Sequence, residues 1–216
     1  MNGGAGLRLC VMISGRGSNM LTIARACASG AINASMALVV ADRPAAGGIP
    51  SARELGLPVA VIAAREFQDR TAFEQALRTA IDASGAQLVV LAGFMRILSP
   101  AFAAHYAGRM LNIHPSLLPL YPGLHTHERV LAAGDAQHGC SVHYVTGVLD
   151  GGPLLMQARV PVLPGDSPAG LSARVQQQEH IIYTEVIGLI AAGRLALRGT
   201  TPLLDGQVLR EPLIRG

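Results

Sequence analysis

The sequence contains no lysine, and all 17 of its basic residues are arginine. Without a lysine side chain, the chain cannot form the Schiff base of ordinary pyridoxal phosphate chemistry, and it cannot carry a Walker A lysine. Tryptophan is also absent, and aromatic residues make up only 4% of the chain. Because the arginines are dispersed as well, a nucleic-acid-binding surface is not expected, whereas the net charge of +3 is compatible with small anionic ligands.

Cysteine is scarce. The three thiols, Cys10, Cys27 and Cys140, have no C-x-x-C spacing, so we predict buried structural thiols rather than a zinc site or a disulfide framework. No apolar run approaches the roughly 20 residues that cross a bilayer. Residues 1–4 lack the basic and apolar regions of a secretory signal. These absences predict a cytoplasmic protein.

Hydrophobic residues are abundant, at 50% of the sequence against 14% charged residues. This composition is typical of a globular chain with a large core, and the length of 216 residues predicts a single domain over residues 1–216. The first half alternates apolar strands with helices. The predicted strands are residues 7–13, 37–40, 58–62 and 88–91, and the predicted helices are residues 20–28, 49–55 and 72–83. This alternation predicts an α/β fold with a Rossmann-like, mostly parallel sheet and helices on both faces, whose ligands bind beyond the carboxyl ends of the strands.

The second half has a different pattern. A strand is predicted at residues 109–113, and the apolar runs at 139–145 and 155–162 are close enough to pair as antiparallel strands. Helices are predicted at residues 126–133 and 169–192. Short runs follow residue 195, with Asp205-Gly206 as a hairpin turn signal within the C-terminal tail of residues 200–216.

The most informative local feature is Asn112-Ile113-His114. Side chains two residues apart on a strand project from the same face, so Asn112 and His114 are expected to lie together. An amide donor beside an imidazole suits stabilisation of an oxyanion with proton transfer, although a polar strand end with a surface histidine has the same pattern. Asp150, followed by two glycines, either forms only a turn or reaches His114, where a carboxylate would raise the imidazole pKa.

Two further segments combine glycine or apolar residues with polar groups. Residues 14–19 follow the first strand and form either a phosphate cradle at a helix N-terminus or a glycine turn with Ser18 as N-cap. Residues 94–98 follow the fourth strand and either cover a flat heterocycle or lead into a helix capped by Ser99. The histidines lack metal-ligand spacing, so no metal site is predicted, and Thr126 is a candidate N-cap beside two of them.

Six segments together resemble the phosphoribosylglycinamide formyltransferase family, folate-dependent enzymes of purine biosynthesis. They are SGRGSN at residues 14–19, LAGFMRIL at 91–98, NIHPSLLP at 112–119, YPGLHTH at 121–127, HGCSVH at 138–143 and LDGGP at 149–153. The resemblance extends over about residues 7–195. Arg16 and Leu120 depart from it, since many members carry Asn at the first position and Lys or Ser at the second.

The resemblance implies transfer of the formyl group of 10-formyltetrahydrofolate, the co-substrate, to the amino group of glycinamide ribonucleotide. It implies a catalytic trio of Asn112, His114 and Asp150. It implies that the ribonucleotide is bound by Gly17, Ser18, Asn19, Gln176 and Glu179. It implies that the folate is bound by Arg70, Met95, Arg96, Ile97, Leu98, Asn112, Thr146, Gly147, Val148, Leu149 and Asp150. The partners are then two small molecules, with no nucleic acid, membrane or metal, and the chain is a monomer or homodimer.

Two other functions stay open at this point. A formyltetrahydrofolate hydrolase would share Asn112, His114 and Asp150 but would have no use for the phosphate loop. A non-catalytic nucleotide-binding module would use the phosphate loop and leave the trio unexplained.

Overall fold

The structure is a computed structural model that describes residues 6–215. Residues 1–4, on which the expectation about a secretory signal rests, lie outside this part. The chain divides into two compact units, Met1–Leu111 and Asn112–Gly216. The single domain expected from the length stays a prediction.

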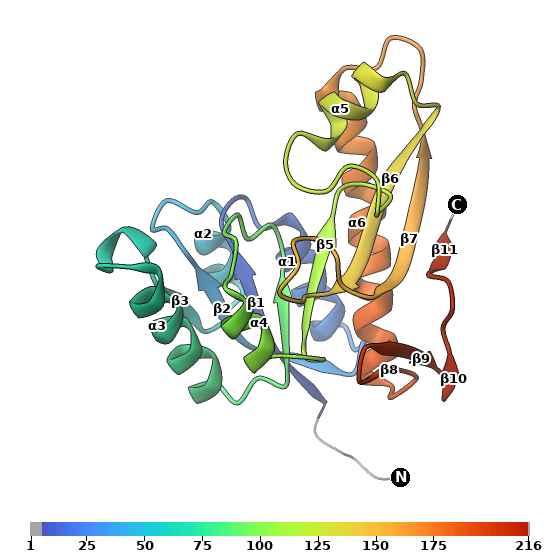
Figure 1. Ribbon diagram of the computed structural model, residues 1–216. Coiled ribbons are helices and arrows are strands. Elements are labelled where there is room, and N and C mark those ends of the chain that lie inside the picture. The colour runs from blue at the N-terminus through green and yellow to red at the C-terminus, as the bar shows by residue number, and fades with distance from the viewer. Residues whose placement is uncertain (1–5, 216) are drawn as a thin grey trace. The chain divides into compact units, whose positions relative to one another are not determined.

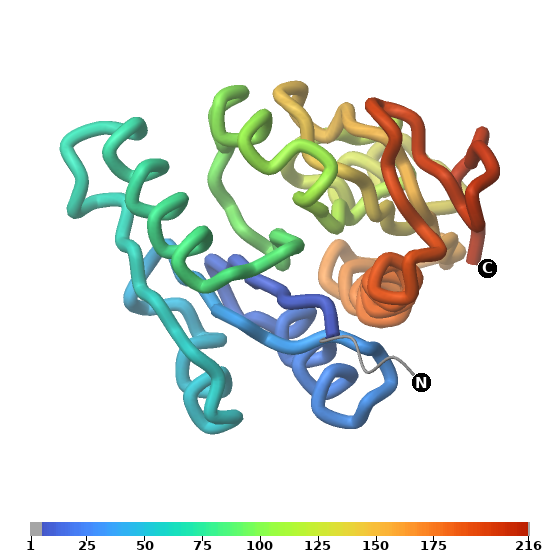
Figure 2. Tube along the Cα trace, turned by 90° about the horizontal axis from the view of Figure 1, so that it is seen from below, coloured from blue at the N-terminus to red at the C-terminus, as the bar shows by residue number. Residues whose placement is uncertain are grey.

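Unit 1 is a layered α/β structure (Figure 1). Its strands have the order β4-β1-β2-β3 and all run parallel. They are β1 (Leu7–Ile13), β2 (Ala34–Ala41), β3 (Val59–Val61) and β4 (Leu88–Leu91), and the helices are α1 (Ser18–Ala28), α2 (Gly48–Glu54), α3 (Arg70–Ala83) and α4 (Pro100–His105), with a short 3₁₀ turn at Ala64–Glu66. Figure 2 shows α1 and α2 on one face of the sheet and α3 and α4 on the other. The predicted α/β class and Rossmann-like parallel sheet are therefore confirmed.

Unit 2 carries the antiparallel strands. Strand β5 (Met110–His114) starts in the last two residues of unit 1 and is followed by α5 (Thr126–Ala133). Strands β6 (Gln137–Tyr144) and β7 (Leu154–Pro161) pair antiparallel, as predicted, and the long helix α6 (Pro168–Ala191) packs against both. Apolar side chains buried on α6 fix this packing: Leu171, Val175, Ile182, Tyr183, Val186 and Ile187.

The end of unit 2 forms a second, three-stranded sheet and one strand that the sequence did not predict. The small sheet contains β8 (Leu195–Arg198), β9 (Thr201–Leu204) and β10 (Gln207–Val208). Asp205 and Gly206 join its last two strands with φ angles of 50° and 79°, the two positive values that a type I′ hairpin turn needs. The unpredicted strand is β11 (Leu213–Arg215), which pairs parallel with β7.

Two helix N-caps differ from the prediction. Gly17, rather than Ser18, is the N-cap of α1, and His125, rather than Thr126, is the N-cap of α5; both have left-handed backbone angles and make no side-chain cap. A Cβ atom at Gly17 would lie 3.2 Å from the Cα atom of Gly48, a tight contact, so close approach as well as the positive φ favours glycine there. Ser99 caps α4 as predicted, accepting a hydrogen bond from the amide of Phe102.

The three thiols differ in burial. Cys10 and Cys140 are buried, but Cys27 is only half-buried on α1, so the prediction of three buried thiols is wrong for Cys27. Among residues 6–215, no helix is long and apolar enough to cross a membrane.

Candidate active site

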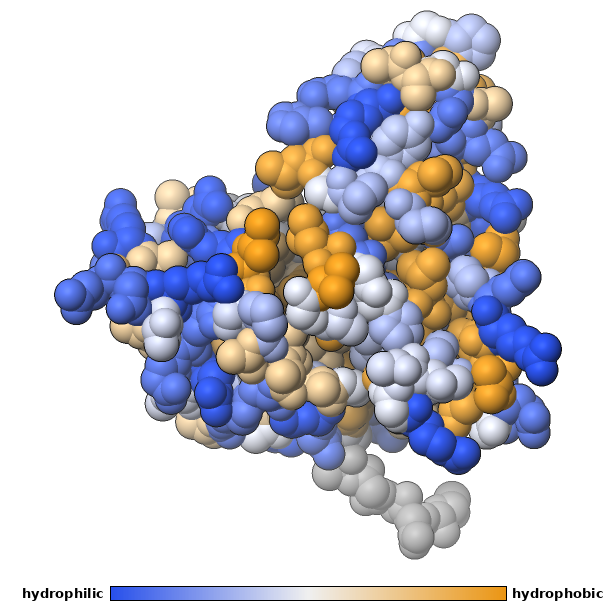
Figure 3. All heavy atoms as spheres, viewed as in Figure 1, coloured by the Kyte–Doolittle hydropathy of each residue, from blue (hydrophilic) through white to orange (hydrophobic). Residues whose placement is uncertain are grey.

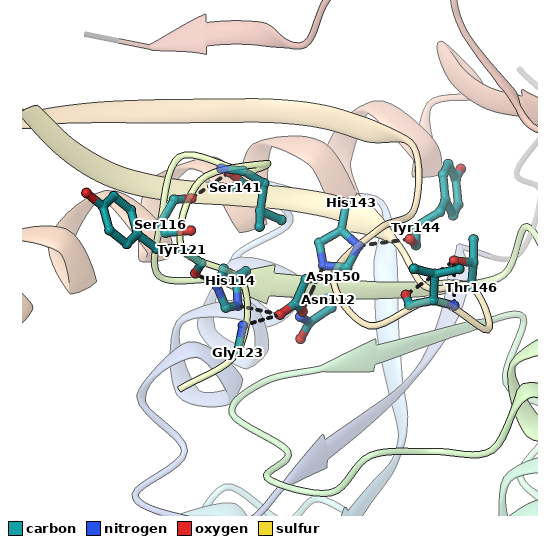
Figure 4. A network of polar contacts seen from close by, with 12 residues as sticks. Asn112, His114, Ser116, Tyr121, Gly123, Ser141, His143, Tyr144, Thr146 and Asp150 are labelled. Atoms are coloured by element: carbon teal, nitrogen blue, oxygen red, sulfur yellow. Dashed lines mark hydrogen bonds and ion pairs between the residues drawn. The ribbon is translucent and has the colours of Figure 1, made fainter. Parts of the chain in front are cut away.

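The polar cluster at the end of β5 lies wholly within unit 2 (Figure 4). Asn112 is half-buried and His114 is buried, on a strand whose other residues are apolar. The side chains of His143 from β6 and Asp150 from the loop before β7 point toward them. The structure thus brings together the three residues expected at the catalytic centre and adds a fourth.

His114 has an acceptor oxygen at each ring nitrogen. Its Nε2 atom lies 2.9 Å from the carbonyl oxygen of Tyr121, and its Nδ1 atom lies 3.4 Å from Oδ2 of Asp150. A carbonyl and a carboxylate can only accept hydrogen bonds, so each ring nitrogen of His114 faces an acceptor. The side chains of His114 and Asp150 are each 7% exposed, which shields this contact from water.

The backbone of the Asp150 loop holds the carboxylate in place. Asp150 has a φ of 51°, and its Oδ2 atom accepts a 2.8 Å hydrogen bond from the amide of Gly123. A Cβ atom at Gly152 would lie 1.7 Å from the carbonyl oxygen of Tyr144, so only glycine allows the loop to pass so close to β6. Gly152 therefore lets a turn with exposed outer residues pass close to β6, so that the Asp150 carboxylate is directed inward.

His143 is the member of the cluster that sequence reasoning missed. Its Nδ1 atom donates to the carbonyl oxygen of Tyr144 at 2.9 Å, and burial lowers its pKa, so the neutral ring carries its proton on Nδ1. The bare Nε2 atom then accepts a hydrogen bond from Nδ2 of Asn112 at 3.2 Å and lies 3.8 Å from Oδ1 of Asp150. The available signal in the sequence was the HGCSVH motif, which places His143 near the end of a predicted strand.

Two further histidines, His127 and His138, contact each other near the cluster. The Nδ1 atom of His127 lies 2.9 Å from Nε2 of His138, and burial lowers the pKa of both rings, that of His138 to about 4. No cluster of three metal-ligating side chains occurs in the described part of the chain. The neutral rings of His127 and His138 thus hydrogen-bond to each other, whereas the neutral ring of His143 donates to the backbone.

The predicted phosphate loop lies in unit 1, at the N-terminus of α1. Gly17 turns the chain into the helix, so the first amides of α1 have no partner within the helix and face outward along its axis. Ser18 is half-buried and Asn19 is buried there. The other predicted ribonucleotide residues, Gln176 and Glu179, lie half-buried on α6 in unit 2. Their joint role stays a prediction.

The residues expected to bind folate also divide between the units. In unit 1, Met95 and Ile97 are 66% and 68% exposed, and Arg70 and Arg96 are half-exposed. In unit 2, the loop of residues 146–149 exposes Val148 and Leu149. Figure 3 shows such hydrophobic side chains at the surface among hydrophilic ones. A ligand-binding surface can expose apolar side chains in this way, and the folate-binding role of these residues stays a prediction.

Residues 7–187 match the protein family described as "Formyl transferase". This chain belongs to the formyl transferase family. The resemblance predicted from the six motifs is confirmed. Among similar formyl transferases, the phosphoribosylglycinamide formyltransferase of Escherichia coli K12 is 50% identical over 203 residues, which cover 94% of this chain and 96% of that protein.

Two further relatives are also phosphoribosylglycinamide formyltransferases. The Haemophilus influenzae phosphoribosylglycinamide formyltransferase is 42% identical over 202 residues, covering 94% of this formyl transferase and 95% of that one. The solved structure of the phosphoribosylglycinamide formyltransferase of Coxiella burnetii, in complex with CHES, has a TM-score of 0.93 at 47% identity and covers 98% of this chain and 100% of that one. The similarity therefore extends over both units.

Proposed function

We propose that this formyl transferase moves the formyl group of 10-formyltetrahydrofolate to the amino group of glycinamide ribonucleotide, in purine biosynthesis. The observation that carries the proposal is the buried contact of His114 with Asp150 beside Asn112, in a chain 50% identical to an E. coli phosphoribosylglycinamide formyltransferase over almost its whole length. The reaction fits a cytoplasmic enzyme, as a monomer or homodimer.

The proposed chemistry is direct transfer. The amine of the ribonucleotide attacks the formyl carbon, a carbon–nitrogen bond forms, and the formyl oxygen becomes an oxyanion. The Asn112 amide donates a hydrogen bond to this oxygen, and the His114 imidazolium turns one of its two N–H groups from its present acceptor to the same oxygen; a well-placed donor typically lowers the barrier by about 3–4 kcal/mol. When the bond to the folate nitrogen breaks, that nitrogen takes the proton of His114, and the proton lost by the attacking amine restores the imidazolium.

His143 has a supporting part in this proposal. The Asn112 amide carries two N–H groups, and the contact with Nε2 of His143 occupies one of them. This contact fixes the orientation of the amide and leaves the second N–H for the oxyanion. His143 is thus a positioning residue, and its neutral state is essential because a protonated Nε2 could not accept the bond.

The binding roles follow the two units. We assign the ribonucleotide phosphate to the amides around Gly17, Ser18 and Asn19, since a helix N-terminus attracts an anion and the chain has no lysine. We assign the ribose part of the ribonucleotide to Gln176 and Glu179. Formyl folate is assigned to Arg70, to residues 95–98 and to residues 146–150, where the exposed apolar side chains lie.

One assay tests the proposal. The protein is mixed with 10-formyltetrahydrofolate, with and without glycinamide ribonucleotide, and release of deformylated folate is followed by absorbance. We expect release only when the ribonucleotide is present. Release without it would indicate a hydrolase, and no release in either mixture would indicate a binding module; both results would contradict the proposed function.

A further inference from the structure

We infer that Glu74 on α3 is a positioning residue for formyl-folate binding, which holds Arg70 and the segment of residues 94–99 in one arrangement. The inference rests on the proposed function, because it takes Arg70 and residues 95–98 as part of the folate-binding surface. Glu74 itself has no expected contact with either substrate.

Glu74 is a buried carboxylate with three donors around it. Its side chain is 10% exposed. Its Oε1 atom accepts a hydrogen bond from Nε of Arg70 at 3.1 Å and another from the backbone amide of Ser99 at 2.7 Å, while Oε2 accepts one from the Ser99 hydroxyl. A buried charge is unfavourable unless such partners compensate it. Glu74 therefore ties the side chain of Arg70 to the end of the 94–99 segment.

The same segment is held at two other points. The hydroxyl of Ser14, at the end of β1, accepts a 2.8 Å hydrogen bond from the amide of Met95. The buried carboxylate of Asp42, at the end of β2, accepts a 2.7 Å hydrogen bond from Nε of Arg96. Between these anchors Met95 and Ile97 extend into solvent. The segment is thus pre-formed with its apolar side chains exposed, as expected for a surface that a flat ligand covers.

Arg70 and Arg96 are each held through the Nε atom of the guanidinium group. Glu74 binds Nε of Arg70 and Asp42 binds Nε of Arg96, and the side chains remain 55% and 43% exposed. The terminal nitrogens of these two groups make no hydrogen bond to any residue between 6 and 215. Each guanidinium group is therefore turned so that its outer edge, which suits a carboxylate, stays available to a ligand.

Two substitutions separate the two contacts of Glu74. In Glu74→Gln the amide can still bond to Ser99, but the charge opposite Arg70 is lost; in Glu74→Ala both contacts are lost. The readouts are kcat, the KM for each substrate, and the Kd for 5-formyltetrahydrofolate by calorimetry. Because loss of a charge-assisted contact typically changes affinity severalfold, we expect the KM and Kd for folate to rise about threefold in Glu74→Gln and about tenfold or more in Glu74→Ala.

An effect confined to folate KM and Kd would distinguish a positioning role of Glu74 from a general loss of stability. The KM for the ribonucleotide and kcat should stay within about twofold of the unaltered protein, because an interaction lost equally from ground and transition states changes KM alone. Glu185→Gln is the matched control, since it removes an exposed carboxylate that also pairs with an arginine, Arg215. It should leave every parameter unchanged.

The contradicting results are equally specific. A lower melting temperature of Glu74→Ala with an unchanged folate KM and Kd, or an equal rise in both KM values, would assign Glu74 a merely structural role. If Glu74→Ala does not fold, Glu74→Gln and Ser99→Ala decide by the same criteria. Absence of formyl transfer by the unaltered protein would contradict the proposed function, and the calorimetric comparison would still decide the role of Glu74 in folate binding.

Discussion

At the scale of single residues, His114 is held between two acceptor oxygens. A carbonyl oxygen at 2.9 Å and a carboxylate oxygen at 3.4 Å leave no acceptor role for either ring nitrogen. An imidazolium is a stronger donor toward an oxyanion than a neutral ring. The proposed chemistry of His114 therefore depends on Asp150.

Substitution of Asp150 by Asn tests this dependence. Asn tolerates the left-handed φ of 51° that Asp150 adopts, so the backbone is kept while the negative charge is removed. We expect kcat to fall by about 10²–10³-fold, because the imidazolium loses its counter-ion, whereas the KM for the ribonucleotide changes little. Steady-state kinetics with both substrates measure this effect.

Asp205→Asn is a close control for that experiment. Asp205 also has a positive φ, of 50°, and also pairs with a cation, Arg194, but it lies in the turn between β9 and β10. Its substitution should leave kcat unaltered. Turnover of Asp150→Asn close to that of Asp205→Asn would remove Asp150 from the mechanism.

The sequence predicts the proximity of Asn112 and His114 but not that of Asp150 or His143. The first pair follows from the two-residue repeat of one strand. Asp150 reaches His114 only because a loop with a left-handed residue passes close to β6, and the contact of His143 with Asn112 depends on strand pairing. Such contacts join residues more than 30 positions apart, and local periodicity carries no information about them.

At the scale of elements, a buried polar network holds the loop after β5. The Ser141 hydroxyl on β6 donates to the carbonyl oxygen of Ser116 at 2.6 Å and accepts from the amide of Leu118 at 3.0 Å. The Gln157 amide on β7 donates to Ser141 and to the carbonyl oxygen of Leu118, both at 2.8 Å. The network thereby fixes the segment that ends at Tyr121, whose carbonyl oxygen accepts the bond from His114.

Gln157→Leu should weaken both the fold and the site. It removes two buried hydrogen bonds and leaves the carbonyl oxygen of Leu118 unsatisfied, which typically costs about 1–3 kcal/mol of unfolding free energy. We also expect kcat to fall, because the Tyr121 carbonyl is no longer held. Urea unfolding and turnover measure the two effects. Gln207→Leu, on exposed β10, is the control, and equal results for both variants would show that the network does not support the loop.

Elements with a strong hydrophobic pattern could be predicted well, whereas features set by unusual backbone angles could not. The prediction for β1 and β4 has the observed bounds, because these wholly or largely buried strands are continuous apolar runs. The prediction for α5 also has the observed bounds, whereas α1 starts two residues before the predicted start; the N-caps of both helices lie one residue before the predicted ones, since left-handed backbone turns replace side-chain caps there. Strand β11 has three residues, none of them buried, and offers no periodicity to detect.

At the scale of the whole molecule, buried neutral histidines make stability depend on pH. Burial, followed by the nearby charges of His127 and His114, lowers the pKa of His138 from its ordinary value of 6.5 to about 4. The unfolded chain binds a proton here as the pH falls below 6.5, and the folded chain does not until about 4. Stability from this group is thus fully present above 6.5 and is lost as the pH falls toward 4.

His138→Gln should reduce this pH dependence. Between pH 7 and pH 5 the unaltered protein should lose about 2 kcal/mol of unfolding free energy at His138, and the variant should lose that much less. Urea unfolding at both pH values measures the difference. His125→Gln, at an exposed position paired with Glu128, should behave like the unaltered protein. The same slope in both variants would mean that His138 is not the group responsible.

The family match spans both units, and the central claim is that the whole chain transfers a formyl group directly between two small molecules. The most direct measurement supplies 10-formyltetrahydrofolate with an isotopically labelled formyl carbon, adds glycinamide ribonucleotide, and follows the label by NMR. The account predicts that the label moves to the amino nitrogen of the ribonucleotide as a formamide, with no free formate. Label released as formate, or retained on the folate, would contradict it.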